Sequence, residues 1–441
     1  MSGIAEVLLS RGDAVSGSDL ARGPVTDRLA SLGARIAIGH AADHARGADV
    51  VVASSAVSDD NPELVEARSR GVPVIPRAQM LAELMRGRRG IAVAGSHGKT
   101  TTTSLVAAVL EAGGLDPTVI VGGRLDRLGS GARVGAGAFF VAEADESDRS
   151  FLRLSPEIAV VTNIDREHLE AYAGMQDLEA AFARFADSVP EGGASVVCSD
   201  DPVVARLLPR LERRVVAYGL APGAAVTASD VELLPTATHY TARSHDAPLG
   251  RVRLPLPGLH NVRNSLAALA TGLELELCFD GIREGLEAFA GVSRRFEIRG
   301  EAAGVCVVDD YGHHPVEIRA TLESLSRFAG SRRRVVVFQP HRYSRTRALW
   351  DDFVAAFDGV DRLLVCDVYA AGEPPLPGAD ARRLAAAIRE RGVEAEAAGD
   401  AAAAAERLAG SVAPGDVVLT LGAGDVWKAG AALLEARGED A

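Results

Sequence analysis

The chain has 441 residues, of which 47% are hydrophobic and 24% charged, and its glycines and prolines are spread along its length. This predicts an ordered globular protein of about three domains and excludes a small disulfide-bonded scaffold. The formal net charge of −13 argues against partners such as nucleic acid or an anionic membrane surface, because both require clustered Lys and Arg. We therefore expect a chemistry of small molecules.

The cysteines and the apolar segments exclude two further classes of protein. No CxxC pair occurs, so neither a zinc site nor a disulfide framework is expected. No apolar run of about 18 residues is present, and the first residues lack the layout of a secretory signal. These features predict a soluble cytoplasmic protein without membrane insertion, whose four cysteines (Cys198, Cys278, Cys306 and Cys366) are reduced.

Short apolar runs alternate with amphipathic helical stretches along the whole chain. Such runs, rich in Val, Ile and Ala, are typical of parallel strands covered by helices on both faces, so the fold class is expected to be α/β with three sheets. Functional side chains in such folds follow the carboxyl ends of strands. The strands are expected within residues 48–57, 90–96, 137–145, 156–165, 332–340 and 415–424.

Two changes in composition predict the domain boundaries. The first is the basic, glycine-flanked segment 85–90, and the second is segment 290–301, which follows a long helical stretch. We expect domains at residues 1–87, 88–294 and 295–441.

The most informative motif follows the strand expected at 90–94. It is a glycine loop that leads into a helix and has the composition of a phosphate-binding loop. Its glycines let backbone N–H groups turn toward an anion, Lys99 can meet the β and γ phosphate oxygens, and the Thr100 hydroxyl can ligate magnesium. The loop has two residues between its glycines where the Walker pattern has four. Lys99 is one of only two lysines in the chain, and the loop comprises Gly95, Ser96, His97, Gly98, Lys99, Thr100 and Thr101.

This loop, "GSHGKTTTT", closely resembles the ATP loop of the Mur ligase superfamily, the ATP-dependent amide-forming enzymes of peptidoglycan precursor synthesis. Further blocks are similar to the alanine-adding branch of that family: "EADESDRSFL", "VVTNIDREHLEAY", "PGLHNVRNSLAA", "DDYGHHPVEI" and "FQPHRYSRTR". The resemblance implies Rossmann-like N-terminal and C-terminal domains around a P-loop ATPase-like central domain. It also implies the substrates ATP, UDP-N-acetylmuramate and L-alanine, with Mg²⁺, in a monomer or a homodimer.

The resemblance implies a magnesium site at the ends of two strands. Glu143 ends the strand of 139–143, and His168 follows the next strand by a short loop. The resemblance makes both residues magnesium ligands together with Thr100, and it leaves open whether Glu146 shares this role. Several relatives also use a carbamylated lysine, but here Arg184 lies in the corresponding helix and no lysine occurs between Lys99 and Lys428.

The remaining blocks imply nucleotide and amino-acid contacts. His260, Asn261 and Asn264 open a helix, so they either cap it or bind the adenosine, and both roles are compatible. In the third domain, two polar clusters are expected at adjacent strand ends, where guanidinium groups can bind a carboxylate. The resemblance implies that Asp310, His313 and His314 approach ATP and that L-alanine contacts Tyr311, His341, Arg342 and Arg345.

The N-terminal region matches the family least well. Family members open with a strand and a glycine-rich loop that binds the UDP diphosphate, whereas Met1 aligns with a methionine inside that loop. We expect the first strand to be missing, its sheet edge to be open and UDP affinity to be weakened. The expected sugar-nucleotide contacts are Ser2, Gly3, Asp19, Ser54, Ser55 and Arg77, although a turn-forming role for Asp19 is equally compatible.

Three functions compete. The first is addition of L-alanine to UDP-N-acetylmuramate through an acyl phosphate. The second is the recycling ligase that attaches a whole peptide to the same sugar nucleotide, against which the "HRYSRTR" cluster favours a small free amino acid. The third is a nucleotide-binding protein without turnover, which would bind ATP and form no amide.

Overall fold

The computed structural model describes residues 1–54, 57–125 and 130–439. It confirms the α/β class and divides into two compact units. None of the helices in these ranges combines the length and apolar character needed to cross a membrane. The first unit comprises Met1–Val231, His239–Pro255 and Asn261–Val292, and the second comprises Glu232–Thr238, Leu256–His260 and Ser293–Ala441.

The N-terminal segment carries two small parallel sheets, β1–β2 and β3–β4. The expectation of three sheets is therefore wrong, because the described residues form four. Within the described residues of the run at 48–57, the three-residue strand β3 is the only strand, and it is half-buried, since a strand with a single partner cannot be covered like a central one. The elements are α1 (Ser2–Ser10), β1 (Ser16–Asp19), α2 (Pro24–Ser31), β2 (Arg35–Ile38), β3 (Val51–Ala53), α3 (Pro62–Ser69), β4 (Val74–Pro76) and α4 (Arg77–Met85).

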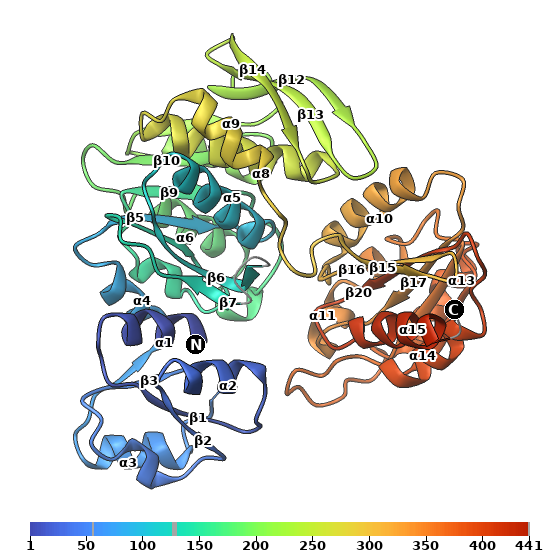
Figure 1. The fold of residues 1–441 in the computed structure, drawn as a ribbon, viewed down its shortest axis with the longest axis horizontal. Helices are drawn as coiled ribbons and strands as arrows, with labels where there is room; N and C mark the ends of the chain where they lie inside the picture. Colours follow the sequence, from blue (N-terminus) through green and yellow to red (C-terminus); the bar gives the residue numbers. More distant parts are fainter. Residues whose placement is uncertain (55–56, 126–129, 440–441) are drawn as a thin grey trace. The chain divides into compact units, whose positions relative to one another are not determined.

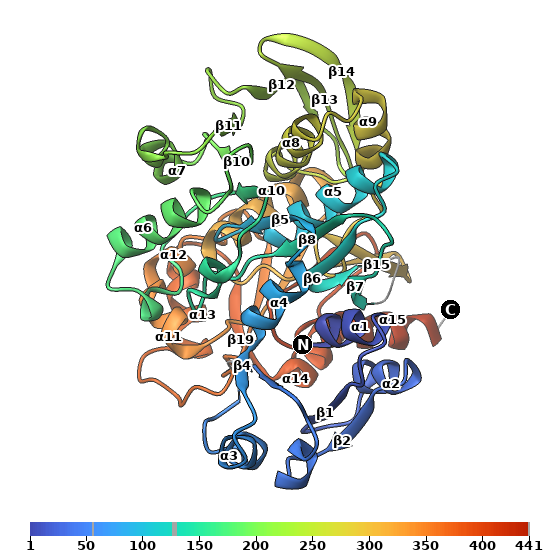
Figure 2. The same cartoon turned by 90° about the vertical axis from the view of Figure 1, so that its left-hand side faces the viewer.

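Helices α1 and α4 join this segment to the central sheet. Ile4 and Val7 of α1 and Leu84 of α4 are buried in the same hydrophobic cluster as Phe140 of the central sheet. Helix α1 contacts β7, and both views show the two elements side by side (Figures 1 and 2). A Cβ atom on Gly3 would lie 3.1 Å from the Cβ of Ala132, so this helix approaches β7 closely.

A ten-stranded sheet forms the centre of the first unit, in the order β14-β13-β12-β11-β10-β9-β5-β8-β6-β7. Strand β5 lies between β8 and β9 and is parallel to both, so the carboxyl ends of all three strands meet at one edge. The strands are β5 (Arg89–Ala94), β6 (Thr118–Leu125), β7 (Ser130–Arg133), β8 (Phe139–Glu143), β9 (Ile158–Val161), β10 (Ala194–Cys198), β11 (Val215–Tyr218), β12 (Val226–Leu233), β13 (Thr238–Ser244) and β14 (Ala247–Leu254).

Helix α5 begins at the phosphate-loop lysine and packs on β5, β6 and β8. Ten of its fourteen residues are buried, and the helix contacts both the sheet and α9, whose Gly285 lies close to Ala108 and Val109. The helices of this part are α5 (Lys99–Ala112), α6 (Met175–Ala186), α7 (Pro202–Leu207), α8 (Leu259–Glu274) and α9 (Phe279–Glu287).

The second unit contains a six-stranded sheet in the order β15-β16-β20-β17-β18-β19. Strands β16 and β17 carry the two predicted polar clusters, but β20 lies between them, so the expectation of adjacent strand ends is wrong. The elements are β15 (Glu297–Ala302), β16 (Val305–Asp310), α10 (Pro315–Ala329), β17 (Arg334–Phe338), α11 (Tyr343–Ala348), α12 (Trp350–Val354), β18 (Arg362–Cys366), α13 (Ala381–Glu390), β19 (Ala395–Gly399), α14 (Ala401–Ala409), β20 (Val417–Leu421) and α15 (Trp427–Glu439).

Candidate active site

The loop between β5 and α5 closes around the ammonium group of Lys99. Its Nζ donates to the carbonyl oxygens of Gly95 and Ser96, at 2.6 and 3.2 Å, and to Oε1 of Glu146 at 2.7 Å. The lysine ammonium therefore lies inside the loop, where a phosphate oxygen could accept a hydrogen bond from it in place of one of these oxygens. The structure places the predicted loop residues together, as the motif requires.

Residues after β9 hold this loop from the side. The Asn163 side-chain oxygen accepts a hydrogen bond from the His97 N–H at 2.8 Å, and the Thr162 hydroxyl donates to the His97 carbonyl at 2.7 Å. Sequence analysis did not identify Thr162 and Asn163 as loop contacts. The available signal was their position directly after a strand that neighbours β5 in the sheet.

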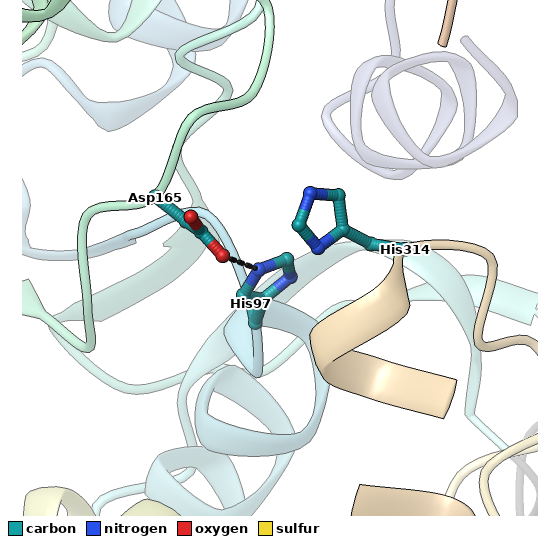
Figure 3. Close-up of side chains that lie close together, drawn as sticks. All are labelled: His97, Asp165 and His314. Carbon is teal, nitrogen blue, oxygen red and sulfur yellow. Dashed lines mark hydrogen bonds and ion pairs between the residues drawn. The ribbon is translucent and has the colours of Figure 1, made fainter. Parts of the chain in front are cut away.

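Asp165 fixes two further atoms of the loop. Its carboxylate pairs with Nε2 of His97 at 3.0 Å, as Figure 3 shows, and its backbone N–H donates to the Ser96 hydroxyl at 2.8 Å. The His97 side chain is thus oriented by Asp165, which sequence analysis also missed.

Helix α8 approaches the loop through Asn264. The Thr102 hydroxyl donates to Oδ1 of Asn264 at 3.2 Å, and Nδ2 of Asn264 donates to Oδ1 of Asn261 at 3.2 Å. These contacts are directed to α5 and within α8, so the side chain of Asn264 ties the two helices together. His260 lies in the first turn of α8, and Thr101 is buried in the first turn of α5.

Glu143 and Thr100, two of the expected magnesium ligands, contact each other. The Thr100 hydroxyl donates to Oε2 of Glu143 at 2.9 Å, and the backbone N–H of Gly122 donates to the same oxygen at 2.9 Å. A Cβ atom on Gly122 would lie 2.8 Å from Oε1 of Glu143, so the carboxylate approaches β6 closely. Hydroxyl and carboxylate oxygens are the ligand atoms that Mg²⁺ prefers.

Glu146 is buried opposite Lys99 and is 1% exposed. Burial raises the pKa of Glu146 to about 7, although the charge of Lys99 opposes this shift. Burial by itself lowers the pKa of Lys99, but the carboxylates of Glu146 and Glu143 outweigh it and raise that pKa above its usual value. Tyr172 donates its hydroxyl to the Glu146 carbonyl at 2.5 Å, which anchors this part of the chain.

The Glu146 carboxylate also belongs to a second ligand cluster. Ligand atoms of Glu146, Glu167 and His168 all lie within 4.8 Å of one another. Oε2 of Glu146 is buried and makes no hydrogen bond within the part of the chain that is described. His168, the third predicted magnesium ligand, thus groups with Glu146 and with Glu167, which sequence analysis did not name.

In the second unit, the predicted amino-acid residues converge around His341. The ring centroid of His313 lies 5.5 Å from that of Tyr311 and 5.6 Å from that of His341. The Arg345 guanidinium donates to Nδ1 of His341 at 3.3 Å, and because guanidinium only donates, the neutral imidazole carries its proton on Nε2. Side chains from β16 and β17 therefore meet although β20 separates these strands.

Asp310, predicted to approach ATP, is buried at the end of β16. Its carboxylate accepts hydrogen bonds from the backbone N–H groups of Gly312 and Phe296, at 2.7 and 2.8 Å, and from the Thr321 hydroxyl at 3.2 Å. Burial raises the pKa of Asp310 to about 6. These bonds show that Asp310 organises the turn that carries Tyr311 and His313.

The expected sugar-nucleotide residues are spread over the N-terminal segment. Arg77 begins α4 and pairs with Asp145 at 3.2 Å, which brings it toward the segment after β8. Oδ1 of Asp19 accepts from the backbone N–H of Ala21 at 3.3 Å, as in the turn-forming alternative. Ser2 and Gly3 open α1, Ser54 follows β3, and Ser55 lies outside the described residues.

Three family models together match most of the chain. They describe the Mur ligase family catalytic domain at residues 1–89, the Mur ligase middle domain at residues 93–272 and the Mur ligase glutamate ligase domain at residues 294–424. The chain belongs to the Mur ligase family. The family resemblance first seen in the glycine loop is thus confirmed, and it extends over all three matched segments.

Individual relatives agree with this assignment. A UDP-N-acetylmuramate–L-alanine ligase from Geobacter sp. (strain M21) is 53% identical over 98% of this Mur ligase and 94% of the relative. The crystal structure of UDP-N-acetylmuramate-alanine ligase MurC from Thermotoga maritima has a TM-score of 0.85 and 29% identity, over 100% of this chain and 97% of that one. A murein peptide ligase from Psychrobacter arcticus shares the fold, with a TM-score of 0.72 and 22% identity over 99% and 96% of the two chains.

Replacement of Gly98 by alanine is expected to weaken ATP binding to this Mur ligase by about tenfold. Gly98 has φ 78°, and a Cβ atom there would lie 2.7 Å from Oδ1 of Asn264. Gly114 is a matched control, since it has φ 73° and no atom within 4 Å of the added Cβ. Calorimetric titration with ATP should show weaker binding for Gly98→Ala alone, and equal weakening in both variants would contradict the role of the Asn264 contact.

The neutral state of His341 predicts a pH-dependent stability. Burial, aided by the charges of His313 and Arg345, lowers the pKa of His341 to about 3. The His341 imidazole binds a proton more tightly in the unfolded chain than in the folded protein. The free energy of unfolding is therefore at its full value above about pH 6.5 and falls as the pH decreases toward 3. The free energy of unfolding of His341→Phe should therefore fall less than that of the wild type between pH 6.5 and 4, by up to about 3 kcal/mol after allowance for partial exposure. Denaturant unfolding measures this free energy at each pH, and an equal decrease in both proteins between pH 6.5 and 4 would refute the prediction.

Proposed function

We propose that this Mur ligase joins L-alanine to the lactyl carboxylate of UDP-N-acetylmuramate at the expense of ATP. The observation that carries the assignment is the likeness over almost the whole chain to ligases named for this reaction, at 53% identity in one case. The geometry supports it, because the loop around Lys99 has the form of a phosphate site and the second unit gathers guanidinium groups suited to a small carboxylate.

The reaction begins with activation of the carboxylate. A lactyl oxygen attacks the γ phosphorus of ATP, the bond from that phosphorus to the bridging oxygen breaks, and ADP leaves. Lys99 stabilises the charge that develops on the phosphate oxygens, because its ammonium is held in the loop by backbone carbonyls and already carries a proton. The Thr162 hydroxyl and the Asn163 amide both donate to the His97 carbonyl, which orients the peptide between His97 and Gly98, and the Gly98 N–H of that peptide would provide a further donor.

The amine of L-alanine then attacks the carbonyl carbon of the acyl phosphate. The tetrahedral intermediate expels inorganic phosphate, and the amide forms as the amine loses its proton. Tyr311, His341, Arg342 and Arg345 are the proposed contacts of L-alanine, and His313 and Asp310 shape this part of the second unit.

The residues present fit a divalent cation. Thr100 and Glu143 offer two hard oxygen ligands 2.9 Å apart, and Glu146 holds a buried carboxylate oxygen close to Glu167 and His168. We propose Thr100, Glu143 and His168 as ligands of Mg²⁺, without a carbamylated lysine, because Arg184 lies in the corresponding helix α6 and is not a metal ligand. When bound, Mg²⁺ would neutralise charge on the ATP phosphates.

The remaining proposals concern substrate contacts and domains. His260, Asn261 and Asn264 would contact adenosine, beside the loop residues Gly95 to Thr101. Ser2, Gly3, Asp19, Ser54, Ser55 and Arg77 would line the sugar-nucleotide site. We also propose the division into domains 1–87, 88–294 and 295–441.

The deciding experiment measures phosphate release and product mass with ATP, UDP-N-acetylmuramate and L-alanine. The proposal predicts release only when all three substrates are present, together with a product heavier than the sugar nucleotide by one alanine residue. The peptide-recycling alternative predicts turnover with a murein peptide and none with L-alanine. Binding of ATP without any amide product would instead support the nucleotide-binding protein without turnover.

A further inference from the structure

The loop that follows β18 is joined to the segment that carries the proposed alanine contacts. The backbone N–H of Tyr369 donates to the Pro340 carbonyl at 2.8 Å, and the N–H of Arg342 donates to the Tyr369 carbonyl at 2.8 Å. These bonds form an isolated parallel bridge between His341 and Tyr369. The polar segment after β17 is therefore held by a second loop that carries none of the predicted site residues.

Side chains reinforce this connection. The rings of Tyr369 and His341 are stacked, with centroids 5.5 Å apart and an interplanar angle of 8°. Behind the tyrosine, a Cβ atom on Gly424 would lie 2.7 Å from the Tyr369 ring, so the loop after β20 packs closely against it. Three strand ends thus determine where His341 lies.

Arg342 has a strained backbone in this segment. Its φ of 68° and ψ of 134° lie where residues other than glycine are rarely found. Such conformations are energetically unfavourable and persist only where surrounding contacts enforce them. The contacts that enforce this one should therefore be identifiable.

Glu373 adds side-chain contacts to the backbone bond that joins Arg342 to Tyr369. Its carboxylate accepts hydrogen bonds from the Ser344 hydroxyl at 2.6 Å and from the Ser344 N–H at 2.9 Å. The same carboxylate lies 3.4 Å from Nε of Arg342. Burial raises the pKa of Glu373, but the Ser344 donors and the charge of Arg342 outweigh it and hold that pKa below its usual value, so the group is ionised at neutral pH.

We propose that Glu373 is a positioning residue, which holds the strained Arg342 in the orientation needed to bind the carboxylate of the amino-acid substrate. The inference rests on the proposed function, because it assigns the Arg342 guanidinium to that substrate. Glu373 does not itself contact the substrate in this proposal. It acts through its contacts with the Arg342 side chain and with the hydroxyl and backbone N–H of Ser344. Its loss should weaken L-alanine binding while the chemistry at the ATP loop is unchanged.

The test compares Glu373→Gln with the wild type. The amide keeps one acceptor oxygen for Ser344 but loses the charge that faces Arg342, so we expect the KM for L-alanine to rise about tenfold, with kcat and the KM for ATP within about twofold of the wild type. Asp358→Asn is the control, because Asp358 forms an ion pair with Arg391 on the surface of the same unit. It should leave all three constants unchanged.

A double-mutant cycle shows whether Glu373 acts through Arg342. In an Arg342→Lys background, Glu373→Gln should raise the KM for L-alanine little further, because the oriented guanidinium is already gone. Independent, additive effects would overturn the proposal. So would a Glu373→Gln variant whose KM for L-alanine equals that of the wild type.

A readout independent of turnover separates this inference from the proposed function. Hydrogen exchange at the amides of Arg342 and Ser344 should be faster in Glu373→Gln than in the wild type or in Asp358→Asn. Unchanged exchange would overturn the inference whatever the activity. If the wild-type protein forms no amide between L-alanine and UDP-N-acetylmuramate, the proposed function is overturned. Faster exchange in Glu373→Gln would in that case still support the positioning of Arg342 by Glu373.

Discussion

Replacement of Lys99 by methionine is expected to reduce ligation on the order of a thousandfold. The ammonium group is held inside the phosphate loop by the carbonyls of Gly95 and Ser96. In the reaction it would stabilise charge on the transferred phosphoryl group, and methionine offers a similar shape without the charge. The measurement is phosphate release at saturating concentrations of all three substrates.

The same substitution should also destabilise the fold. It removes the cation that faces the buried carboxylate of Glu146, and breaking a buried ion pair on one side typically costs about 3–5 kcal/mol. Because Lys99 lowers the pKa of Glu146, its loss should raise that pKa further above about 7. A carboxyl group whose pKa is higher in the folded protein than in the unfolded chain destabilises the fold at pH values above the pKa of the unfolded chain. The loss of stability should therefore be small near pH 4 and should grow as the pH rises toward neutral.

A double variant separates catalysis from stability. Lys99→Met combined with Glu146→Gln removes both buried charges and should recover most of the free energy of unfolding, while ligation stays at the level of the single variant. Denaturant unfolding and phosphate release on the same preparations measure both quantities. Recovery of activity in the double variant would contradict the role of Lys99 at the phosphates.

Replacement of Glu143 by glutamine is expected to lower ligation by about 10²- to 10³-fold and to raise the Mg²⁺ concentration needed for turnover. The amide oxygen can still accept from Thr100 and Gly122, so the fold should be unaffected, but the negative charge that favours a divalent cation is lost. Glu157→Gln is the matched control, because Glu157 pairs with Arg89 at the opposite end of β5 and β9.

The Mg²⁺ titration also tests Glu143 against Glu146. If Glu143 is the principal ligand, Glu146→Gln should shift the Mg²⁺ dependence less than Glu143→Gln does. Binding of Mn²⁺ in the presence of ATP, followed by electron paramagnetic resonance, provides a readout that does not depend on turnover. An unchanged Mn²⁺ affinity in Glu143→Gln would refute its assignment as a ligand.

Much of the site could be predicted because it lies in short continuous segments. The glycine loop follows β5 directly and leads into Lys99 and the first turn of α5, and Glu143 is the last residue of β8. The local residue pattern and the length of the strands were therefore enough to locate these residues. Strand order was harder, because sequence does not show which strands are neighbours. The position of β20 between β16 and β17 is decided by pairing between residues more than 80 positions apart.

The α/β class, the phosphate loop and most of the polar groups at the strand ends could therefore be inferred from local residue patterns. Which of these groups contact one another depends on how the chain folds in space. Glu146 against Lys99, Asp165 against His97 and Glu373 against Arg342 join residues from different loops. Such contacts depend on strand order and on the buried environment of each pair, and neither property is encoded in the residues next to it in the chain.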